Sequence, residues 1–189
     1  MDMAPIPKTE LYKACARMRT PGLSLEFGVW KGGSLNYLAD LVHPDKIYGF
    51  DSFEGLPEEW DTGREFHQKG HFATKLPEVR PNAELVPGWF SKTLPEFLEK
   101  HPGDIALLHI DSDIYSSAKF ILESLDHRIV PGTLIIFDEL CDFTEDGAFY
   151  PKWREGEWKA VSEWLKEKKR SIRPLFRNED SRAAVLVLK

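Results

Sequence analysis

Two almost uninterrupted apolar runs, Ile105–Ile110 and Thr133–Phe137, constrain the fold of this chain most strongly. Such runs are typical of strands covered on both faces, because a half-exposed strand would alternate apolar and polar residues. A helical pattern over 116–128 lies between them and is stopped by Pro131-Gly132. The order strand, helix, strand predicts a parallel sheet with right-handed crossovers and helices on both faces.

The other periodic segments continue the same alternation. Further helices are predicted over 9–19, 35–43 and 157–169, with another opening on the capping box Thr93–Glu96. Further strands are predicted over 23–27, 46–51, 83–90, 172–177 and 183–188. A polar turn joins the last two strands, which suits an antiparallel pair. We therefore predict one α/β domain over 1–189, with an N-terminal helix within 1–21 and a mostly parallel sheet whose last strand is antiparallel.

Composition limits the partners of this domain. The formal net charge of −6 argues against a broad surface for nucleic acid or membrane. Cys15 and Cys141 lie far apart in the chain and fit a reducing compartment. The chain has no basic-then-apolar leader, and no apolar run approaches the roughly 20 residues of a membrane span. We expect a cytoplasmic protein without nucleic acid or membrane partners; the sequence leaves homo-oligomer formation open.

The stretch Leu23–Leu35 predicts a ligand-binding turn. An apolar strand is followed by Gly28 and the pair Gly32-Gly33, and Ser34 is expected to be the N-cap of the next helix. Glycines let a ligand approach the backbone, and the helix N-terminus attracts negative groups. The same pattern also occurs at ordinary turns between strand and helix, and its spacing is not G-x-G-x-x-G.

Acidic residues follow four of the predicted strands. Parallel strands end at one edge of a sheet, so we expect these side chains to converge there. Five like charges at one rim are costly unless cations neutralise them. Asp51 also lies 25 positions after Glu26, near the spacing at which such folds bind a ribose. The five residues are Glu26, Asp51, Asp111, Asp138 and Glu139.

Residues 54–79 show no clear period. Segments of this length inside a domain are usually functional loops or disordered. The aromatic residues and the two histidines of this segment, His67 and His71, favour a lid over the sheet edge rather than a solvated linker.

Five motifs then occur in the order expected of one family. They are Glu26–Ser34, Tyr48–Pro57, Gly88–Phe90 with Thr93–Pro95, Leu108–Ser117, and Val130–Gly132 with Ile136–Asp138. With these motifs the chain resembles the macrocin O-methyltransferase (TylF/MycF) family over about residues 22–140. Members of that family are class I S-adenosylmethionine-dependent enzymes that methylate sugar hydroxyls of natural products. Glu139 departs from the family pattern, which has a second aspartate there.

The resemblance implies a Rossmann-like class I methyltransferase sheet, S-adenosylmethionine as donor and Mg²⁺ as metal. Glu26 would meet the donor's amino group, Ser34 its carboxylate and Asp51 its ribose, and Trp89 and Phe90 would flank the adenine. The full set of implied donor-binding residues is Glu26, Phe27, Gly28, Lys31, Gly32, Ser34, Asp51, Ser52, Trp89, Phe90 and Asp111. The implied metal ligands are Asp111, Asp138 and Glu139, and the implied contacts to a glycoside-like acceptor are Glu58 and Tyr115.

The group that removes the acceptor proton has several candidates. Asp111 and Asp138 are two of them, although a metal-bound carboxylate is a poor base. The loop histidines His67 and His71 are the others, because their loop leaves the strand end that carries Asp51. His109 lies inside an apolar strand, so we interpret it as a core histidine.

Two other functions are compatible with the predicted fold. One is a nicotinamide-dependent oxidoreductase, which the missing G-x-G-x-x-G and the lack of a second catalytic domain disfavour. The other is a binding protein that kept the fold without the activity, which the intact strand-end acids disfavour.

Overall fold

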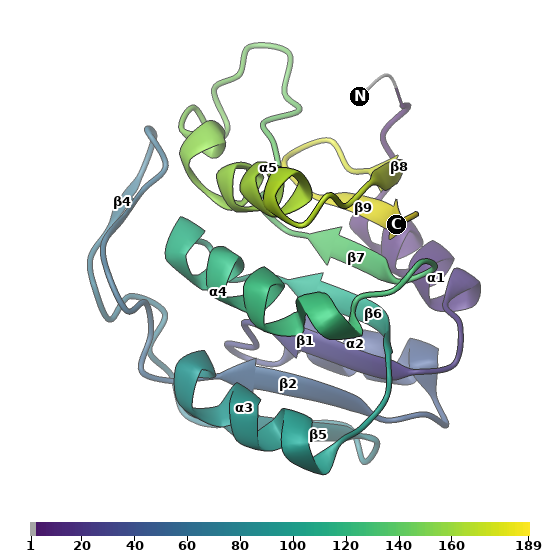
Figure 1. The fold of residues 1–189 in the computed structure, drawn as a ribbon. Helices are drawn as coiled ribbons and strands as arrows, with labels where there is room; N and C mark the ends of the chain where they lie inside the picture. The colour runs from purple at the N-terminus through teal and green to yellow at the C-terminus, as the bar shows by residue number, and fades with distance from the viewer. Residues whose placement is uncertain (1–2) are drawn as a thin grey trace.

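The two apolar runs form the centre of a seven-stranded sheet in the computed structural model, which describes residues 3–189 (Figure 1). The strand order is β5-β2-β1-β6-β7-β9-β8. The parallel strands are β1 (Leu23–Phe27), β2 (Ile47–Asp51), β5 (Ala83–Pro87), β6 (Ile105–Ile110) and β7 (Leu134–Phe137). β9 (Ala183–Val187) runs antiparallel to both of its neighbours, β7 and β8 (Ile172–Arg177). The predicted mostly parallel sheet with an antiparallel last strand is confirmed.

Helices cover both faces of the sheet (Figure 1). One face carries α1 (Lys8–Met18) and α2 (Gly33–Val42). The other carries α3 (Phe90–Lys100), α4 (Tyr115–Leu125) and α5 (Glu157–Glu167). Two 3-10 turns follow α4 and precede α5, at Asp126–Arg128 and Trp153–Glu155. Within residues 3–189, each helix lacks the length or the apolarity needed to cross a membrane.

Two helices begin at N-caps other than those that their sequence patterns predict. α2 starts at Gly33 with Gly32 as N-cap in the left-handed conformation, so Ser34 is not the cap. The Ser34 hydroxyl instead donates a hydrogen bond to Glu26. α3 starts at Phe90, which places Thr93 inside the helix, where its hydroxyl donates to the Trp89 carbonyl. The predicted capping box is therefore wrong, because a backbone turn at Gly88 starts the helix before Thr93 can cap it.

The irregular segment 54–79 contains a short hairpin that projects past the ends of the central strands (Figure 1). Its strands are β3 (Trp60–Asp61) and β4 (Phe66–His67), which pair antiparallel. Lys152 fastens β3 to the segment before α5: its ammonium lies 2.7 Å from Asp61, and its backbone N–H donates to the Thr62 carbonyl at 3.0 Å. The hairpin is thus fixed above the sheet edge.

The chain reverses its direction of winding between β1 and β6. From β1 the strand order proceeds to β2 and β5 on one side, and from β6 to β7 on the other. Phe27 and Ile110 are paired at the carboxyl ends of β1 and β6. In sheets of this kind ligands bind beyond such a switch point, where the connecting helices diverge.

Candidate functional site

A cavity of about 390 Å³ opens at this switch point. Its walls come from the turn between β1 and α2, the end of β2, the start of α3 and the residues after β6. The lining residues of the predicted donor set are Gly28, Ser34, Asp51, Ser52, Trp89, Phe90 and Asp111. With Asp113, a further lining residue, three carboxylates line this cavity, together with four aromatic residues, Trp30, Phe72, Trp89 and Phe90.

Gly28 brings two strand ends into direct contact at the floor of this cavity. Its φ of 91° is accessible to glycine, and a Cβ there would lie 1.6 Å from the Asp111 carbonyl oxygen. The Asp111 N–H donates to the Phe27 carbonyl at 2.8 Å, which continues the pairing of β1 and β6 into the site. A side chain at position 28 would therefore displace Asp111.

Asp51 organises the rim between β1 and β2. One of its oxygens accepts hydrogen bonds from the backbone N–H groups of Val29 at 2.8 Å and Trp30 at 2.7 Å. The other accepts from the Phe53 N–H at 2.7 Å. The carboxylate fixes two turns and still lines the cavity. Binding of a ribose by Asp51 stays a prediction, compatible with the lone pairs that remain on its two oxygens.

Four members of the predicted donor set lie outside the cavity lining. Glu26 is fully buried beneath it and accepts from Ser34 Oγ at 2.9 Å. Phe27 belongs to the core and stacks on Phe50 with ring centroids 4.6 Å apart. Lys31 places its ammonium 4.2 Å from the Trp30 ring, and Gly32 serves as the N-cap of α2. These four residues support the turn between β1 and α2, and none of them lines the first cavity.

A second cavity of about 460 Å³ adjoins the first. Phe72 and Asp113 line both, so the two spaces meet at these residues. The predicted loop histidines, His67 and His71, line the second cavity with their ring centroids 4.5 Å apart. The other predicted site residues there are Asp138 and Glu139. The irregular segment and two of the strand-end acids therefore line one cavity, and the role of the segment as a lid stays a prediction.

One acidic cluster stands where the cavities meet. Asp111, Asp113 and Glu139 each offer a carboxylate oxygen within 4.8 Å of those of the other two. Glu139 Oε2 is buried and has no hydrogen-bond partner within residues 3–189. Burial and then the charge of Asp138 raise the pKa of Asp111 to about 7, and burial followed by neighbouring carboxylates raises the pKa of Asp113 and Glu139. Only oxygen ligands are present, which fits a hard cation such as Mg²⁺.

Glu157 adds a fully buried carboxyl group beside the three half-buried ones of this cluster. It is the first residue of α5, and its Oε2 accepts from the Glu139 N–H at 3.0 Å. Its Oε1 has no partner in the described chain. Burial, then the charge of Asp138, raises the pKa of Glu157. A cation between these carboxyl groups would lower their mutual repulsion.

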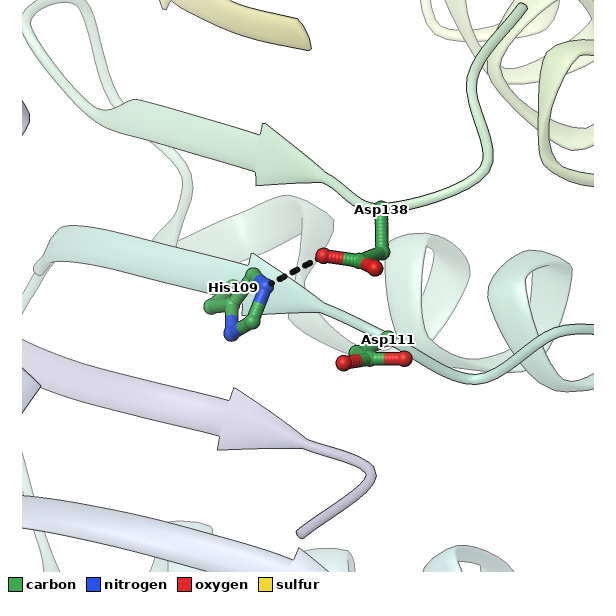
Figure 2. Close-up of side chains that lie close together, drawn as sticks. All are labelled: His109, Asp111 and Asp138. Carbon is green, nitrogen blue, oxygen red and sulfur yellow. Dashed lines mark hydrogen bonds and ion pairs between the residues drawn. The ribbon is translucent and has the colours of Figure 1, made fainter. Parts of the chain in front are cut away.

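A second cluster joins His109, Asp111 and Asp138 at the ends of β6 and β7 (Figure 2). His109 Nε2 lies 3.2 Å from Asp138, and Nδ1 lies 3.1 Å from Glu26. Burial would lower the pKa of His109, but these two carboxylates raise it to about 10. The imidazole is then a cation with both nitrogens protonated, so it has no lone pair for a metal. His109 is a core histidine, as interpreted, and it balances two buried carboxylates.

Asp138 is bound differently from the sequence-based expectation. Arg182, just before β9, donates to both of its oxygens. Burial would raise the pKa of Asp138, but the hydrogen bond from His109 and the charge of Arg182 lower it. The predicted metal set of Asp111, Asp138 and Glu139 is therefore not gathered as one cluster. Asp113 lies with Asp111 and Glu139 in the carboxylate cluster, and the Asp-Ser-Asp sequence after β6 is the one pattern that could have indicated it.

The two predicted acceptor contacts lie outside both cavities. Glu58 accepts from Ser116 Oγ at 2.7 Å, and the Tyr115 hydroxyl donates to Glu163 at 2.7 Å. Neither side chain lines a cavity. Glu58 joins the irregular segment to α4, and Tyr115 joins α4 to α5. Their role in acceptor binding stays a prediction.

A methyltransferase domain family matches residues 25–140, a range that includes the carboxyl ends of β1, β2, β6 and β7 at the two cavities. The chain belongs to this family. The methyltransferase domain is 32% identical over 166 residues to an 8-demethyl-8-(2,3-dimethoxy-alpha-L-rhamnosyl)-tetracenomycin-C 4'-O-methyltransferase of Streptomyces olivaceus, covering 76% of this chain and 62% of that protein. It is 26% identical over 153 residues to the mycinamicin III 3''-O-methyltransferase of Micromonospora griseorubida, covering 68% and 59%. The chain thus spans about three fifths of the length of these curated relatives.

Solved structures agree with the fold of this methyltransferase domain. The calicheamicin methyltransferase CalS11 superposes with a TM-score of 0.73 at 26% identity, covering 94% of this chain and 77% of that one. The MycE methyltransferase, solved with Mg and S-adenosylhomocysteine, gives a TM-score of 0.58 at 16% identity over 95% of this chain and 48% of that one, a likeness of fold alone. The sheet is that of the class I methyltransferases.

Proposed function

We propose that this protein is an S-adenosylmethionine-dependent O-methyltransferase that acts on a sugar hydroxyl of a small molecule, as members of the macrocin O-methyltransferase family do. The observation that carries the proposal is the junction of two cavities at Phe72 and Asp113. One cavity lies at the switch point of the sheet, and the other holds an acidic cluster under a histidine-bearing loop. Methyl transfer needs a donor site and an acceptor site that adjoin, because the acceptor oxygen must reach the methyl carbon of the donor.

The first cavity accounts for the donor. Asp51 would bind the ribose at the end of β2, and Trp89 and Phe90 provide the flat apolar surface that an adenine ring needs. Gly28 lines this cavity and, having no Cβ, lets the Asp111 backbone lie directly against the end of β1. The methyl group would then be presented toward Asp113, where the second cavity begins.

Asp111, Asp113 and Glu139 would hold Mg²⁺, and Glu157 would position Glu139 through its backbone amide. The bound cation would lower the pKa of an acceptor hydroxyl. Asp138 would not be a ligand. It would stay ionised through its pairs with Arg182 and His109, and its negative charge would lie near Asp111. The partial exposure of the three ligands leaves them open to the cavity.

The second cavity would bind the acceptor. Trp60 and Tyr150 form an aromatic wall, with a hydrogen bond of 3.4 Å from the indole to the tyrosine hydroxyl. Aromatic faces of this kind suit the apolar face of a sugar ring. His67 or His71 would accept the proton that the hydroxyl loses as its oxygen attacks the methyl carbon and the carbon–sulfur bond breaks. The relatives' names support a sugar acceptor, and one solved structure of CalS11 is named a TDP-rhamnose 3'-O-methyltransferase.

The proposal is tested by methyl transfer from labelled S-adenosylmethionine to a panel of nucleotide-linked deoxysugars and glycosylated polyketides. We expect label in at least one sugar, formation of S-adenosylhomocysteine in equal amount, and loss of transfer in excess EDTA with recovery on addition of Mg²⁺. Transfer at the full rate in EDTA would contradict the proposed metal. Absence of both transfer and donor binding would contradict the proposed activity.

A further inference from the structure

The proposed donor cavity has an uneven charge distribution. Its acidic side chains are Asp51, Asp111 and Asp113, and they suit the cationic sulfonium and amino groups of S-adenosylmethionine. The donor also carries one carboxylate, which these side chains would repel. Among the described lining residues, Lys8 is the only one with a cationic side chain.

Lys8 lies at the start of α1, at the same part of the sheet edge as the first turn of α2. Gly33 and Ser34 line the cavity there, and no side chain caps that turn. The Ser34 hydroxyl is committed to Glu26 at 2.9 Å. An anion at this position would therefore meet backbone N–H groups on one side and the Lys8 ammonium on the other.

The position of Lys8 is fixed by the packing of α1. Tyr12 lies one turn later on the same face, with the Lys8 ammonium 5.5 Å from its ring centroid. The Tyr12 side chain is buried, and its hydroxyl lies 3.3 Å from His109 Nε2. Before α1, the Ile6 N–H donates to the Arg177 carbonyl at 2.9 Å. The start of α1 is thus tied to the sheet on both sides of Lys8.

The Lys8 ammonium is available for a ligand. Within residues 3–189 the ion pairs involve other cations, including Lys13 of the same helix, which binds Glu10 at 2.7 Å. Lys31, the cation of the predicted donor set, instead covers the Trp30 ring at 4.2 Å and does not line the cavity. The cationic side chain at this cavity therefore belongs to Lys8 of the N-terminal helix.

We propose that Lys8 binds the methionine carboxylate of the donor and so makes α1 part of the donor site. This inference rests on the proposed function, because it assigns one residue to one group of that donor. It predicts that Lys8 discriminates between donor-like ligands with and without the carboxylate. 5'-Methylthioadenosine keeps the adenosine and the sulfur and lacks the amino acid, so it should not sense the Lys8 charge.

The test is calorimetric titration of S-adenosylhomocysteine and 5'-methylthioadenosine into the parent protein and into Lys8→Met, Lys8→Arg and the control Lys13→Met. We expect Lys8→Met to weaken S-adenosylhomocysteine about five- to thirty-fold and to leave 5'-methylthioadenosine unchanged. Lys8→Arg should retain most of the affinity, and Lys13→Met all of it.

Three results would overturn the inference while leaving the proposed activity intact. They are unchanged binding of S-adenosylhomocysteine by Lys8→Met, an equal loss for both ligands, and an equal loss in Lys13→Met. Failure of the parent protein to bind S-adenosylhomocysteine would instead contradict the proposed function. The melting temperature of each variant, measured without ligand, shows whether a loss of affinity reflects a loss of folded protein.

Discussion

Arg182 and Asp138 form a buried, two-point ion pair that joins the start of β9 to the end of β7. The antiparallel last strand thereby contributes to the site at the parallel core of the sheet. His109 contacts the same carboxylate from β6, so Asp138 has two cationic neighbours. Its charge is therefore balanced within the protein, whereas Asp113 lies with Asp111 and Glu139 in the cluster made of carboxylates alone.

The first prediction concerns the stability of this ion pair. Asp138→Asn removes the carboxylate, leaves Arg182 buried without its counter-charge and leaves His109 with Glu26 alone, and breaking a buried pair in this way typically costs about 3–5 kcal/mol. Urea denaturation at neutral pH should show that the free energy of unfolding of the variant is lower than that of the parent protein by about this amount. Glu96→Gln, which breaks the exposed pair with Lys100, is the control and should change the stability little, because solvent screens that pair. Similar losses in the two variants would contradict the role of Arg182 and His109.

The second prediction concerns the pH dependence of stability. The pKa of His109 is about 10 in the folded protein and 6.5 as its ordinary value, so the folded state binds the proton more tightly. The stabilisation is complete below about pH 6.5 and is lost as the pH rises toward 10, at about 1.4 kcal/mol per pH unit. In His109→Gln this loss should disappear. Parallel stability curves for parent and variant between pH 6.5 and 10 would refute the assignment.

The third prediction separates the two acidic clusters by metal binding. Asp113→Asn removes one of the three oxygen ligands and should weaken Mg²⁺ binding at least about ten-fold. Asp180→Asn is the control, because Asp180 lines the same cavity but is not part of the cluster. Calorimetric titration of Mg²⁺ into the three proteins gives the affinities. Equal affinities in Asp113→Asn and the parent would exclude Asp113 as a ligand.

The fourth prediction concerns the loop histidines. If His67 or His71 accepts the acceptor proton, its replacement by alanine should lower kcat about 10²-fold or more, with the donor affinity unchanged. His127→Ala is the control, since His127 lies in the turn after α4 and lines neither cavity. Single-turnover rates with a saturating acceptor measure the effect. If both loop variants keep the parent rate, neither histidine accepts the proton, and a carboxylate must do so.

The sequence predicted what depends on local pattern. Hydrophobic periodicity located the strands and helices, and parallel strands necessarily bring their final residues, such as Asp51 and Asp111, to one edge. It did not predict contacts made by distant segments. Arg182 binds Asp138 although the two residues lie 44 positions apart, and no local sequence pattern around either residue predicts this ion pair. Lys8 enters the donor cavity because of how α1 packs, which follows from tertiary contacts of the whole helix.

Binding of S-adenosylhomocysteine tests most directly whether the cavity at the switch point is a donor site. Calorimetric titration should give saturable binding at one site per chain in the parent protein. Asp51→Asn should weaken binding about ten- to a hundred-fold, because one charge-assisted hydrogen bond to the ribose is lost and the carboxylate no longer holds the adjoining turns. Absence of binding by the folded parent protein, or unchanged affinity in Asp51→Asn, would contradict the assignment of this cavity.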